Sequence, residues 1–356
     1  MSHRSRQARI GGRLADNDLD ALIVTDPVNV RYLSGFVGSN GVLVVTAGHR
    51  VLLTDSRYTV AARAQVVDTD VVIAGRDLLD SMAEVVPTGR VGIEADHMTV
   101  ARRDRMASRL RAIDLVPVTG IVEGLRVVKD PGELDLIREA TRVADAALAR
   151  LVAEGFAGRT EAETAWALQG WMRDLGAEGA SFDIIVAGGA HGALPHAVPR
   201  GERIPPDTLV VVDMGARIGG YASDCTRTLS TGILPPALEE AYAVCREAHG
   251  AALAACRAGV HSREVDSAAR NIITAAGLGD RFGHGLGHGV GLDIHERPWL
   301  RQEGGEVLQT GMVVTIEPGI YLEGVGGVRI EDLAVVGDDG CEVLTCVPTD
   351  LITTTI

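Results

Sequence analysis

The sequence contains very little lysine: of its 34 basic residues, only Lys129 is not an arginine. No GxxxxGK[ST] motif occurs, which excludes a P-loop for phosphoryl transfer, and no GxSxG motif occurs, which removes the usual setting of a serine nucleophile. The formal net charge is -14, so there is no positive field that would attract nucleic acid or an anionic membrane surface. We therefore expect neither as a partner.

Long apolar runs and paired cysteines are also missing. No apolar run approaches the roughly 18 residues that a membrane-spanning helix needs, and the arginine-rich N-terminus lacks the apolar stretch of a signal peptide. The five cysteines are an odd number without a CxxC pair, which favours reduced, mostly buried thiols over a disulfide framework or a zinc ribbon. These features predict a cytoplasmic protein without a membrane partner.

The 356 residues are enough for roughly two domains. Up to about residue 120, short β-rich runs alternate with stretches that have helical patterns, which is typical of an α/β domain. The predicted strands are 21–25, 41–46, 51–54, 71–74 and 91–94, and the predicted helices are 56–64, 78–86 and 99–112. We assign residues 1–122 to this N-terminal domain.

A helix-helix-sheet pattern occurs twice in the second domain, which we assign to residues 123–356. Asp130 and Pro131 begin a helix that runs to about Glu154, and a capping box at Thr160 begins another. Residues 238–258 and a shorter helix capped by Ser262 repeat this order, and glycine-punctuated β-rich segments follow each pair. The sequence therefore predicts an α+β fold with an internal duplication.

Two pairs of acidic residues lie at or beside apolar, β-branched runs in this domain. If the glycine-rich turn between them makes a hairpin, Asp213 would lie nearly opposite Asp224, with Cβ atoms about 5 Å apart. Glu317 ends a later run, and Glu331 lies nearly opposite it if the chain between them folds back. Arg329 shares a strand face with Glu331 and can orient a carboxylate. A bound cation or a retained proton makes such pairs tolerable, but turn residues and a surface salt bridge remain alternatives.

Between these pairs, His284, His288 and His295 lie in a run with a glycine at every second position from 283 to 291. Such a run cannot be a helix, which excludes a helical His-x-x-x-His zinc motif, and its context does not fit a nucleotide-binding loop. Glycines instead permit close approach of the backbone to a small substrate or an ion. Carboxylates with one or two imidazoles suit Mn, Co, Fe or Zn in a two-metal hydrolase.

The phrases Ser-Asp-Cys-Thr-Arg, Gly-His-Gly-Val-Gly-Leu-Asp-Ile-His-Glu, Thr-Ile-Glu-Pro-Gly and Arg-Ile-Glu-Asp closely resemble those of the pita-bread metallopeptidases. Because an α/β domain precedes them, the resemblance is to the Xaa-Pro branch, proline dipeptidase and aminopeptidase P. It implies an N-terminal α/β domain followed by an α+β pita-bread catalytic domain with a pseudo-twofold helix-helix-sheet duplication.

The resemblance also implies two divalent ions per chain, with Mn expected first and Co, Zn or Fe as alternatives. Asp224 and Glu331 would bridge the ions, Asp213 would complete the shell of one ion, and His288 and Glu317 would complete that of the other. A metal-bridged hydroxide would attack the carbonyl of an Xaa-Pro bond in a short peptide, while Glu317 takes a proton.

Further residues match the family's pattern outside the ligand set. His196 and His295 match histidines that contact the substrate, and Arg329 matches an arginine behind the ligands. His284 and His191 match less well and are expected in loops or at the rim of the pocket. The resemblance also suggests a homodimer. A creatinase-like amidinohydrolase and a non-catalytic peptide-binding module on the same fold remain alternatives, although both tend to lack the ligands that are present here.

Overall fold

The computed structural model describes residues 3–356, which divide into two compact units at the boundary between residues 126 and 127. The sequence placed the division between the two domains at residue 122. In the described part of the chain, no helix combines the length and apolar character needed to cross a membrane.

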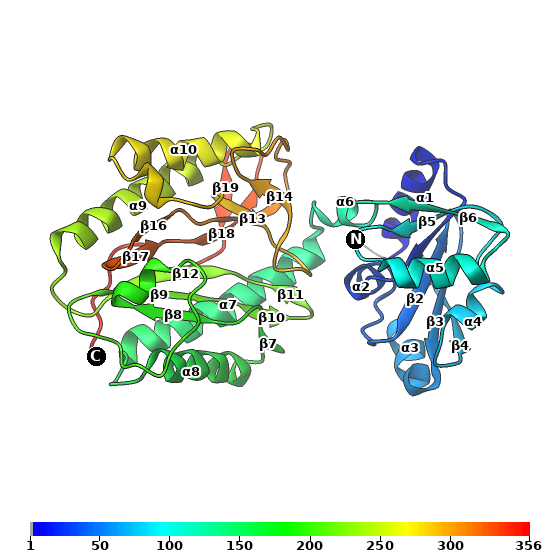
Figure 1. The fold of residues 1–356 in the computed structure, drawn as a ribbon, viewed down its shortest axis with the longest axis horizontal. Helices are drawn as coiled ribbons and strands as arrows, with labels where there is room; N and C mark the ends of the chain where they lie inside the picture. The colour runs from blue at the N-terminus through cyan, green and yellow to red at the C-terminus, as the bar shows by residue number, and fades with distance from the viewer. Residues whose placement is uncertain (1–2) are drawn as a thin grey trace. The chain divides into compact units, whose positions relative to one another are not determined.

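Unit 1 is a six-stranded mixed sheet with helices, in the strand order β4-β3-β2-β1-β5-β6 (Figure 1). All five predicted strands are present, whereas β6 and the helices α1, α2 and α6 were not predicted. The strands are β1 (Ala21–Val24), β2 (Gly41–Thr46), β3 (Arg50–Asp55), β4 (Asp70–Ala74), β5 (Gly89–Glu94) and β6 (Ile113–Val118). The helices are α1 (His3–Asp16), α2 (Pro27–Ser34), α3 (Thr59–Gln65), α4 (Leu79–Met82), α5 (Val100–Arg109) and α6 (Glu123–Arg126).

Unit 2 contains the predicted duplication of a helix pair followed by strands. The first pair is α7 (Pro131–Glu154) and α8 (Glu161–Asp174), and each begins at a capping box, on Asp130 and Thr160 respectively. The second pair is α9 (Pro236–Ala255) and α10 (Ser262–Ala275). The prediction that Ser262 caps α10 is wrong, because the cap position belongs to His261 and Ser262 is the first helical residue.

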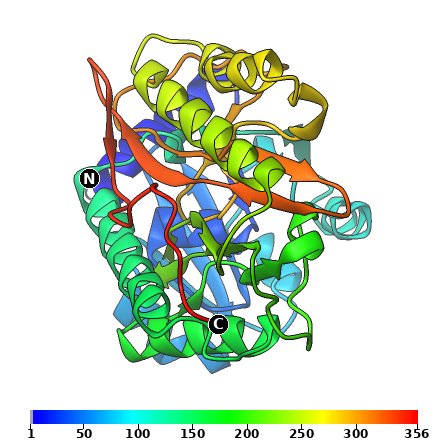
Figure 2. The same ribbon diagram turned by 90° about the vertical axis from the view of Figure 1, so that its left-hand side faces the viewer.

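The strands of unit 2 form small antiparallel sheets, and Figures 1 and 2 show them between the two helix pairs. The first half contributes β7 (Gly179–Ala180), β8 (Ile185–Gly188), β9 (Leu209–Met214), β10 (Ala216–Ile218), β11 (Tyr221–Ala222) and β12 (Cys225–Ser230). The second half contributes β13 (Gly287–Gly289), β14 (Glu296–Leu300), β15 (Val313–Ile316), β16 (Gly319–Leu322), β17 (Gly326–Arg329), β18 (Asp332–Val336) and β19 (Cys341–Val343).

Each half of unit 2 has a hydrophobic core of its own. Buried residues of α7 and α8 pack with β8, β9 and β12 in one core, and those of α9 and α10 pack with β15 to β18 in the other. Burial of these apolar faces is the main favourable term in folding. It also fixes the strands whose ends carry the acidic residues discussed below.

Candidate metal centre

Three buried carboxylates meet at the ends of strands in unit 2. Asp213 lies in β9, Asp224 directly precedes β12, and Glu331 lies between β17 and β18. Each offers an oxygen that lies within 4.8 Å of the other two, and all three residues are buried. The structure therefore brings Glu331 to two acids that precede it by more than a hundred residues in the sequence.

The register of the hairpins explains this convergence. Asp213 lies opposite Thr226 in the β9-β12 ladder, so Asp224 is its diagonal neighbour on the same face of the sheet. In the second half, Ile316 pairs with Asp332 and Gly319 pairs with Arg329. These two pairs flank Glu317 and Glu331, which confirms that the chain between them folds back as predicted.

The electrostatics of the three acids are unfavourable without a cation. Burial and repulsion from the neighbouring carboxylates raise the pKa of Asp224 and of Glu331 well above their usual values. Burial also raises the pKa of Asp213, although Arg329 opposes the shift. In addition, Oδ1 of Asp213 is buried and has no hydrogen-bond partner among the described residues. Carboxylate oxygens that are dry, crowded and unsatisfied suit a multivalent cation.

Arg329 and Thr226 hold two of the acids in place. A terminal nitrogen of Arg329 donates to Oδ2 of Asp213 at 2.6 Å, and its Nε donates to Oγ1 of Thr226 at 3.1 Å. The Thr226 hydroxyl in turn donates to Oε2 of Glu331 at 2.7 Å. The prediction that Arg329 orients a carboxylate thus has a geometric basis, and the carboxylate is that of Asp213.

His288 and Glu317 lie directly beside the three acids. Nε2 of His288 lies 3.3 Å from Oε1 of Glu317 and 3.7 Å from Oδ2 of Asp224. Nδ1 of the same ring lies 3.1 Å from the Gly289 carbonyl oxygen. Because Nδ1 donates there, Nε2 is the atom directed at the carboxylates, as in metal-binding histidines.

The ion pair between His288 and Glu317 shifts both of their pKa values. Burial alone would raise the pKa of Glu317, but the hydrogen bond from His288 and its charge lower it to about 2. Burial would likewise lower the pKa of His288, and Glu317 raises it instead.

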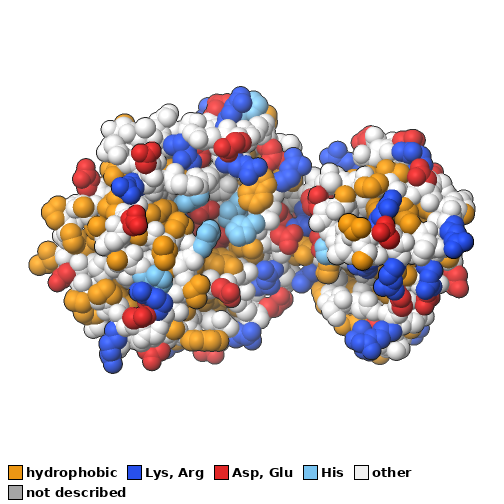
Figure 3. Space-filling view, viewed as in Figure 1, with side chains coloured by type: hydrophobic (Ala, Val, Ile, Leu, Met, Phe, Trp, Pro, Cys, Tyr) orange, Lys and Arg blue, Asp and Glu red, His pale blue; other side chains and the backbone are white. Residues whose placement is uncertain are grey.

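These five residues line one cavity of about 530 Å³ together with His196, His295 and Arg329. Its other walls include Phe182, Ile185 and Trp299, so the cavity combines apolar surface with a polar end and is large enough for a short peptide. On the face of unit 2 in Figure 3, histidine and acidic side chains gather around a hollow. The structure therefore brings together every residue of the predicted site.

His284 and His191, which match the family pattern less well, also have defined contacts. His284 lines the cavity, and its Nε2 lies 3.0 Å from the hydroxyl of Tyr321, which also accepts a hydrogen bond from Arg329 at 2.8 Å. Burial lowers the pKa of His284. His191 instead contacts the buried carboxylate of Glu161, away from the three acids.

Sequence reasoning missed Thr226 and Tyr321, although strand periodicity could have found both. Thr226 follows Asp224 by two residues, so the two side chains lie on one strand face. Tyr321 follows Gly319 by two residues, and Gly319 is the ladder partner of Arg329. Trp299 and Arg301 also line the cavity and were not singled out, because nothing in the pattern distinguishes them from other residues of an edge strand.

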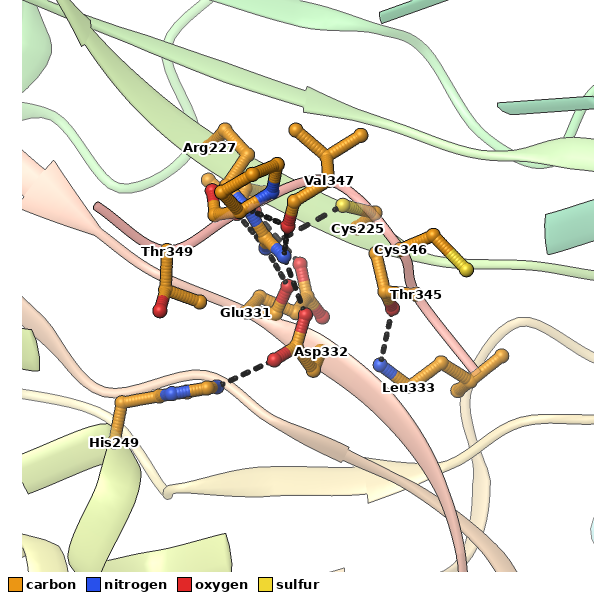
Figure 4. A network of polar contacts seen from close by, with 12 residues as sticks. Cys225, Arg227, His249, Glu331, Asp332, Leu333, Thr345, Cys346, Val347 and Thr349 are labelled. Atoms are coloured by element: carbon orange, nitrogen blue, oxygen red, sulfur yellow. Dashed lines mark hydrogen bonds and ion pairs between the residues drawn. The ribbon is translucent and has the colours of Figure 1, made fainter. Parts of the chain in front are cut away.

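A second polar network holds the backbone of Glu331 from behind (Figure 4). The buried Arg227 of β12 donates to the Glu331 carbonyl at 2.5 Å, to Asp332 at 2.6 Å and to the carbonyl of Val347. His249 of α9 lies 3.2 Å from the other oxygen of Asp332. The network therefore links β12, β18, α9 and the C-terminal segment behind one of the three acids.

The residues present fit divalent metal ions. Four carboxylates and one imidazole surround the polar end of a cavity, and they leave an acceptor without a partner within the described structure. Oxygen-rich donor sets with imidazole in an accessible cavity are those of metal-dependent hydrolases rather than of structural zinc sites. The fold and the site together define this class of enzyme.

Comparison with known proteins gives the family. Residues 135–338 match the model of metallopeptidase family M24, and residues 6–128 match that of the creatinase/prolidase N-terminal domain. The chain belongs to metallopeptidase family M24. The fold is accordingly an N-terminal creatinase-like domain followed by a pita-bread catalytic domain, as predicted.

The similar proteins cover nearly the whole chain. The Xaa-Pro dipeptidase of Pyrococcus furiosus is 35% identical over 93% of this chain and 94% of its own length. The solved structure of an Xaa-Pro dipeptidase from Bacillus anthracis is 36% identical, with a TM-score of 0.95 and coverage of 99% of this chain and 100% of that one. An X-Pro aminopeptidase structure from Thermotoga maritima is 34% identical, with a TM-score of 0.90 and coverage of 98% and 100%.

Proposed function

We propose that this enzyme hydrolyses the Xaa-Pro bond of dipeptides and other short peptides. The observation that carries the proposal is the convergence of Asp213, Asp224 and Glu331 in a cavity of about 530 Å³, with His288 and Glu317 beside them. The names of the similar proteins support proline-directed cleavage, since both dipeptidases and an aminopeptidase are among them.

The proposed ligands are Asp213, Asp224, His288, Glu317 and Glu331. Asp224 and Glu331 would be shared by the two ions, Asp213 would hold one of them, and His288 with Glu317 would hold the other. Two divalent ions supply a water of lowered pKa and polarise a carbonyl group. We propose Mn as the first metal to test, because a carboxylate-rich set suits it, with Co, Zn and Fe as alternatives.

The remaining residues position the substrate and move protons. A carboxylate oxygen of Glu317 would accept the proton of the attacking water. His196 and His295 contact the substrate from the cavity wall and stabilise the charge that develops on the carbonyl oxygen. Arg329 holds Asp213 in its orientation through the 2.6 Å hydrogen bond.

A peptide-cleavage assay tests this function. Protein loaded with Mn, Co or Zn is incubated with Ala-Pro and Ala-Pro-Ala, and Ala-Ala serves as the control without proline. We expect release of alanine from at least one proline peptide and little from Ala-Ala. No proline-dependent cleavage with any of these metals would refute the proposal, and the ratio of the two rates separates a dipeptidase from an aminopeptidase.

Two other functions on the same fold can be distinguished from it. A creatinase-like amidinohydrolase or a non-catalytic peptide-binding module does not need bound metal, whereas this chain has the full set of acids. Metal analysis of the purified protein therefore discriminates. About two ions per chain supports the peptidase, and a protein that is free of metal but hydrolyses amidines or only binds peptides supports one of the alternatives.

Three broader proposals accompany this function. We propose that residues 123–356 form the catalytic domain and that the protein is a homodimer, which light scattering coupled to gel filtration can measure. We also propose a cytoplasmic location. It is supported by the cysteines, all of which are free thiols in the structure.

A further inference from the structure

A buried carboxylate outside the three acids grips the segment that carries His196. Glu161 is the first residue of α8 and is 1% exposed. The segment begins where β8 ends, at Gly188, and returns to the N-terminus of α8 at Arg200. His196 lies at its exposed part, on the wall of the cavity.

The carboxylate of Glu161 contacts the beginning, the middle and the end of this segment. The Gly188 N–H donates to Oε1 at 3.0 Å, and the Arg200 N–H donates to Oε2 at 3.0 Å. Between them, Nδ1 of His191 lies 2.9 Å from Oε2. The Arg200 side chain adds one more contact to each oxygen, from Nε to Oε2 at 3.1 Å and from a terminal nitrogen to Oε1 at 3.2 Å.

The backbone of the segment is docked on the same helix end. The N–H of Ala162 donates to the Arg200 carbonyl at 2.9 Å, and that of Glu161 donates to the Glu202 carbonyl at 3.2 Å. Helix N–H groups that would lack partners are thus satisfied by the returning chain. Near His196 the segment is also held by Arg329, which donates to the Pro195 carbonyl at 3.2 Å, and by the buried side chain of Ala197, which packs with Ile185 and Ala187.

The side chain of His196 makes no hydrogen bond in the described part of the protein, and His196 is exposed. Its place in the cavity therefore depends on the backbone that carries it. The two ends of that backbone are held by Glu161, and a charged acceptor with several donors is a strong, geometrically specific clamp. Burial would raise the pKa of Glu161, but hydrogen bonds from Arg200 and Gly188 lower it, so the carboxylate is ionised.

We propose that Glu161 is a positioning residue that acts on the reaction through His196, by fixing the loop between Gly188 and Arg200. The proposal rests on the proposed function, because it takes His196 as a group that contacts the substrate. A displacement of about 1 Å in such a group can cost up to 100-fold in rate. Loss of one carboxylate remote from the three acids is therefore sufficient to impair turnover.

The test compares Glu161→Gln with Glu163→Gln. Both residues lie in the first turn of α8, but the exposed Glu163 accepts from Thr160, whose N–H lies 2.8 Å from Oε2, and has no hydrogen bond to residues 188–200 in the described structure. Glutamine at 161 places an amide NH2 group against N–H donors. We expect kcat/KM on the proline peptide to fall by on the order of 10-fold in Glu161→Gln, and by less than 2-fold in Glu163→Gln.

A double-mutant cycle with His196→Ala separates positioning from a general loss of structure. If Glu161 acts through His196, adding Glu161→Gln to His196→Ala lowers kcat/KM little further. Losses that multiply, an unimpaired Glu161→Gln enzyme, or full activity in His196→Ala would each overturn the proposal.

Hydrogen exchange gives a readout that does not depend on the substrate. Amides of residues 188–200 should exchange faster in Glu161→Gln than in the wild type and in Glu163→Gln, while α7 stays protected. If the wild-type enzyme cleaves no proline peptide, the proposed function is refuted. Hydrogen exchange then still tests whether Glu161 holds residues 188–200. Unchanged exchange in the segment overturns the positioning role whatever the activity.

Discussion

Removal of metal should destabilise the protein, and more strongly at pH 8 than at pH 6. The cause is the repulsion among Asp213, Asp224 and Glu331, which offer oxygens within 4.8 Å of one another. At an effective dielectric constant of about 20, each ionised pair at this distance repels by roughly 3 kcal/mol. Three pairs give roughly 10 kcal/mol, which is comparable to the roughly 5–15 kcal/mol stability of a whole protein.

The metal-free protein avoids this repulsion by binding protons. Since the pKa values of Asp224 and Glu331 are raised well above the usual range, the folded metal-free state holds more protons than the unfolded chain. Its stability therefore rises as the pH falls toward the unfolded-state values of about 4 and decreases as the pH rises. The pKa of Glu317, lowered to about 2, affects stability only at lower pH. Protons also compete with metal for the carboxylates. Both effects increase the stability difference between the metal-bound and the metal-free protein as the pH rises.

The magnitude follows from binding linkage. Free metal at 100 times its Kd stabilises the folded state by about 2.7 kcal/mol per site. For a unit of this size, one such site raises Tm by about 5–10 °C. Thermal unfolding is measured after chelation and after addition of Mn, from pH 6 to pH 8.

Two variants make the test specific. Glu331→Gln removes one of the three charges, so the metal-free variant should unfold at or above the Tm of the metal-free wild type at pH 8 and respond little to Mn. Glu323→Gln removes an exposed carboxylate elsewhere and should respond like the wild type. An equal increase of Tm on addition of Mn in Glu331→Gln and in the wild type would contradict the reasoning. A metal-free wild type that becomes less stable when the pH is lowered from 8 to 6 would also contradict it.

Three further substitutions test the supporting contacts. Asp224→Ala should remain folded by circular dichroism but retain few metal ions and almost no activity, and retained turnover would contradict its role. Thr226→Val removes the hydroxyl between Arg329 and Glu331 and should lower kcat by on the order of 10-fold. Thr226→Ser keeps the hydroxyl and should retain most of the wild-type kcat. Equal losses in both variants would refute a role that depends on the hydroxyl. Arg227→Met leaves buried acceptors unpaired and should cost roughly 3–5 kcal/mol in urea unfolding, and a loss below about 1 kcal/mol would show that the network in Figure 4 carries little stability.

Most of the fold follows from local sequence signals. The Asp130-Pro131 start predicted α7 with the bounds that the structure has, because the cap, the proline and the following acid all favour the same helix start. Helix α1 was not predicted, since Gly11 and Gly12 lower its helical propensity and its position depends on tertiary packing. Strand β6 was not predicted either, because its Pro117 is unusual within a strand.

The site was accessible from the sequence only in part. An aspartate or glutamate at or beside a run of β-branched residues conflicts with strand propensity, and this conflict marked Asp213 and Glu317. The sequence gives no comparable signal for the contacts of Glu161 with residues 188–200. An acidic residue in the first turn of a helix is common, because it interacts favourably with the helix N-terminus. The contacts of Glu161 are set by the path of a loop, which no local pattern specifies.

The duplicated fold explains why the acids collect where they do. Each half supplies a hairpin whose apolar strands are fixed in their own core, and the acids occupy positions at or near the strand ends, where the ladders bend or stop. A strand end is where a buried chain can turn a carboxylate toward another strand without breaking the ladder hydrogen bonds on which the sheet depends. Cores that pack independently, with acids meeting between them, let stability and metal affinity be altered separately. For that reason Arg227, behind Glu331, should act mainly on unfolding, and Thr226, between Glu331 and Arg329, mainly on turnover.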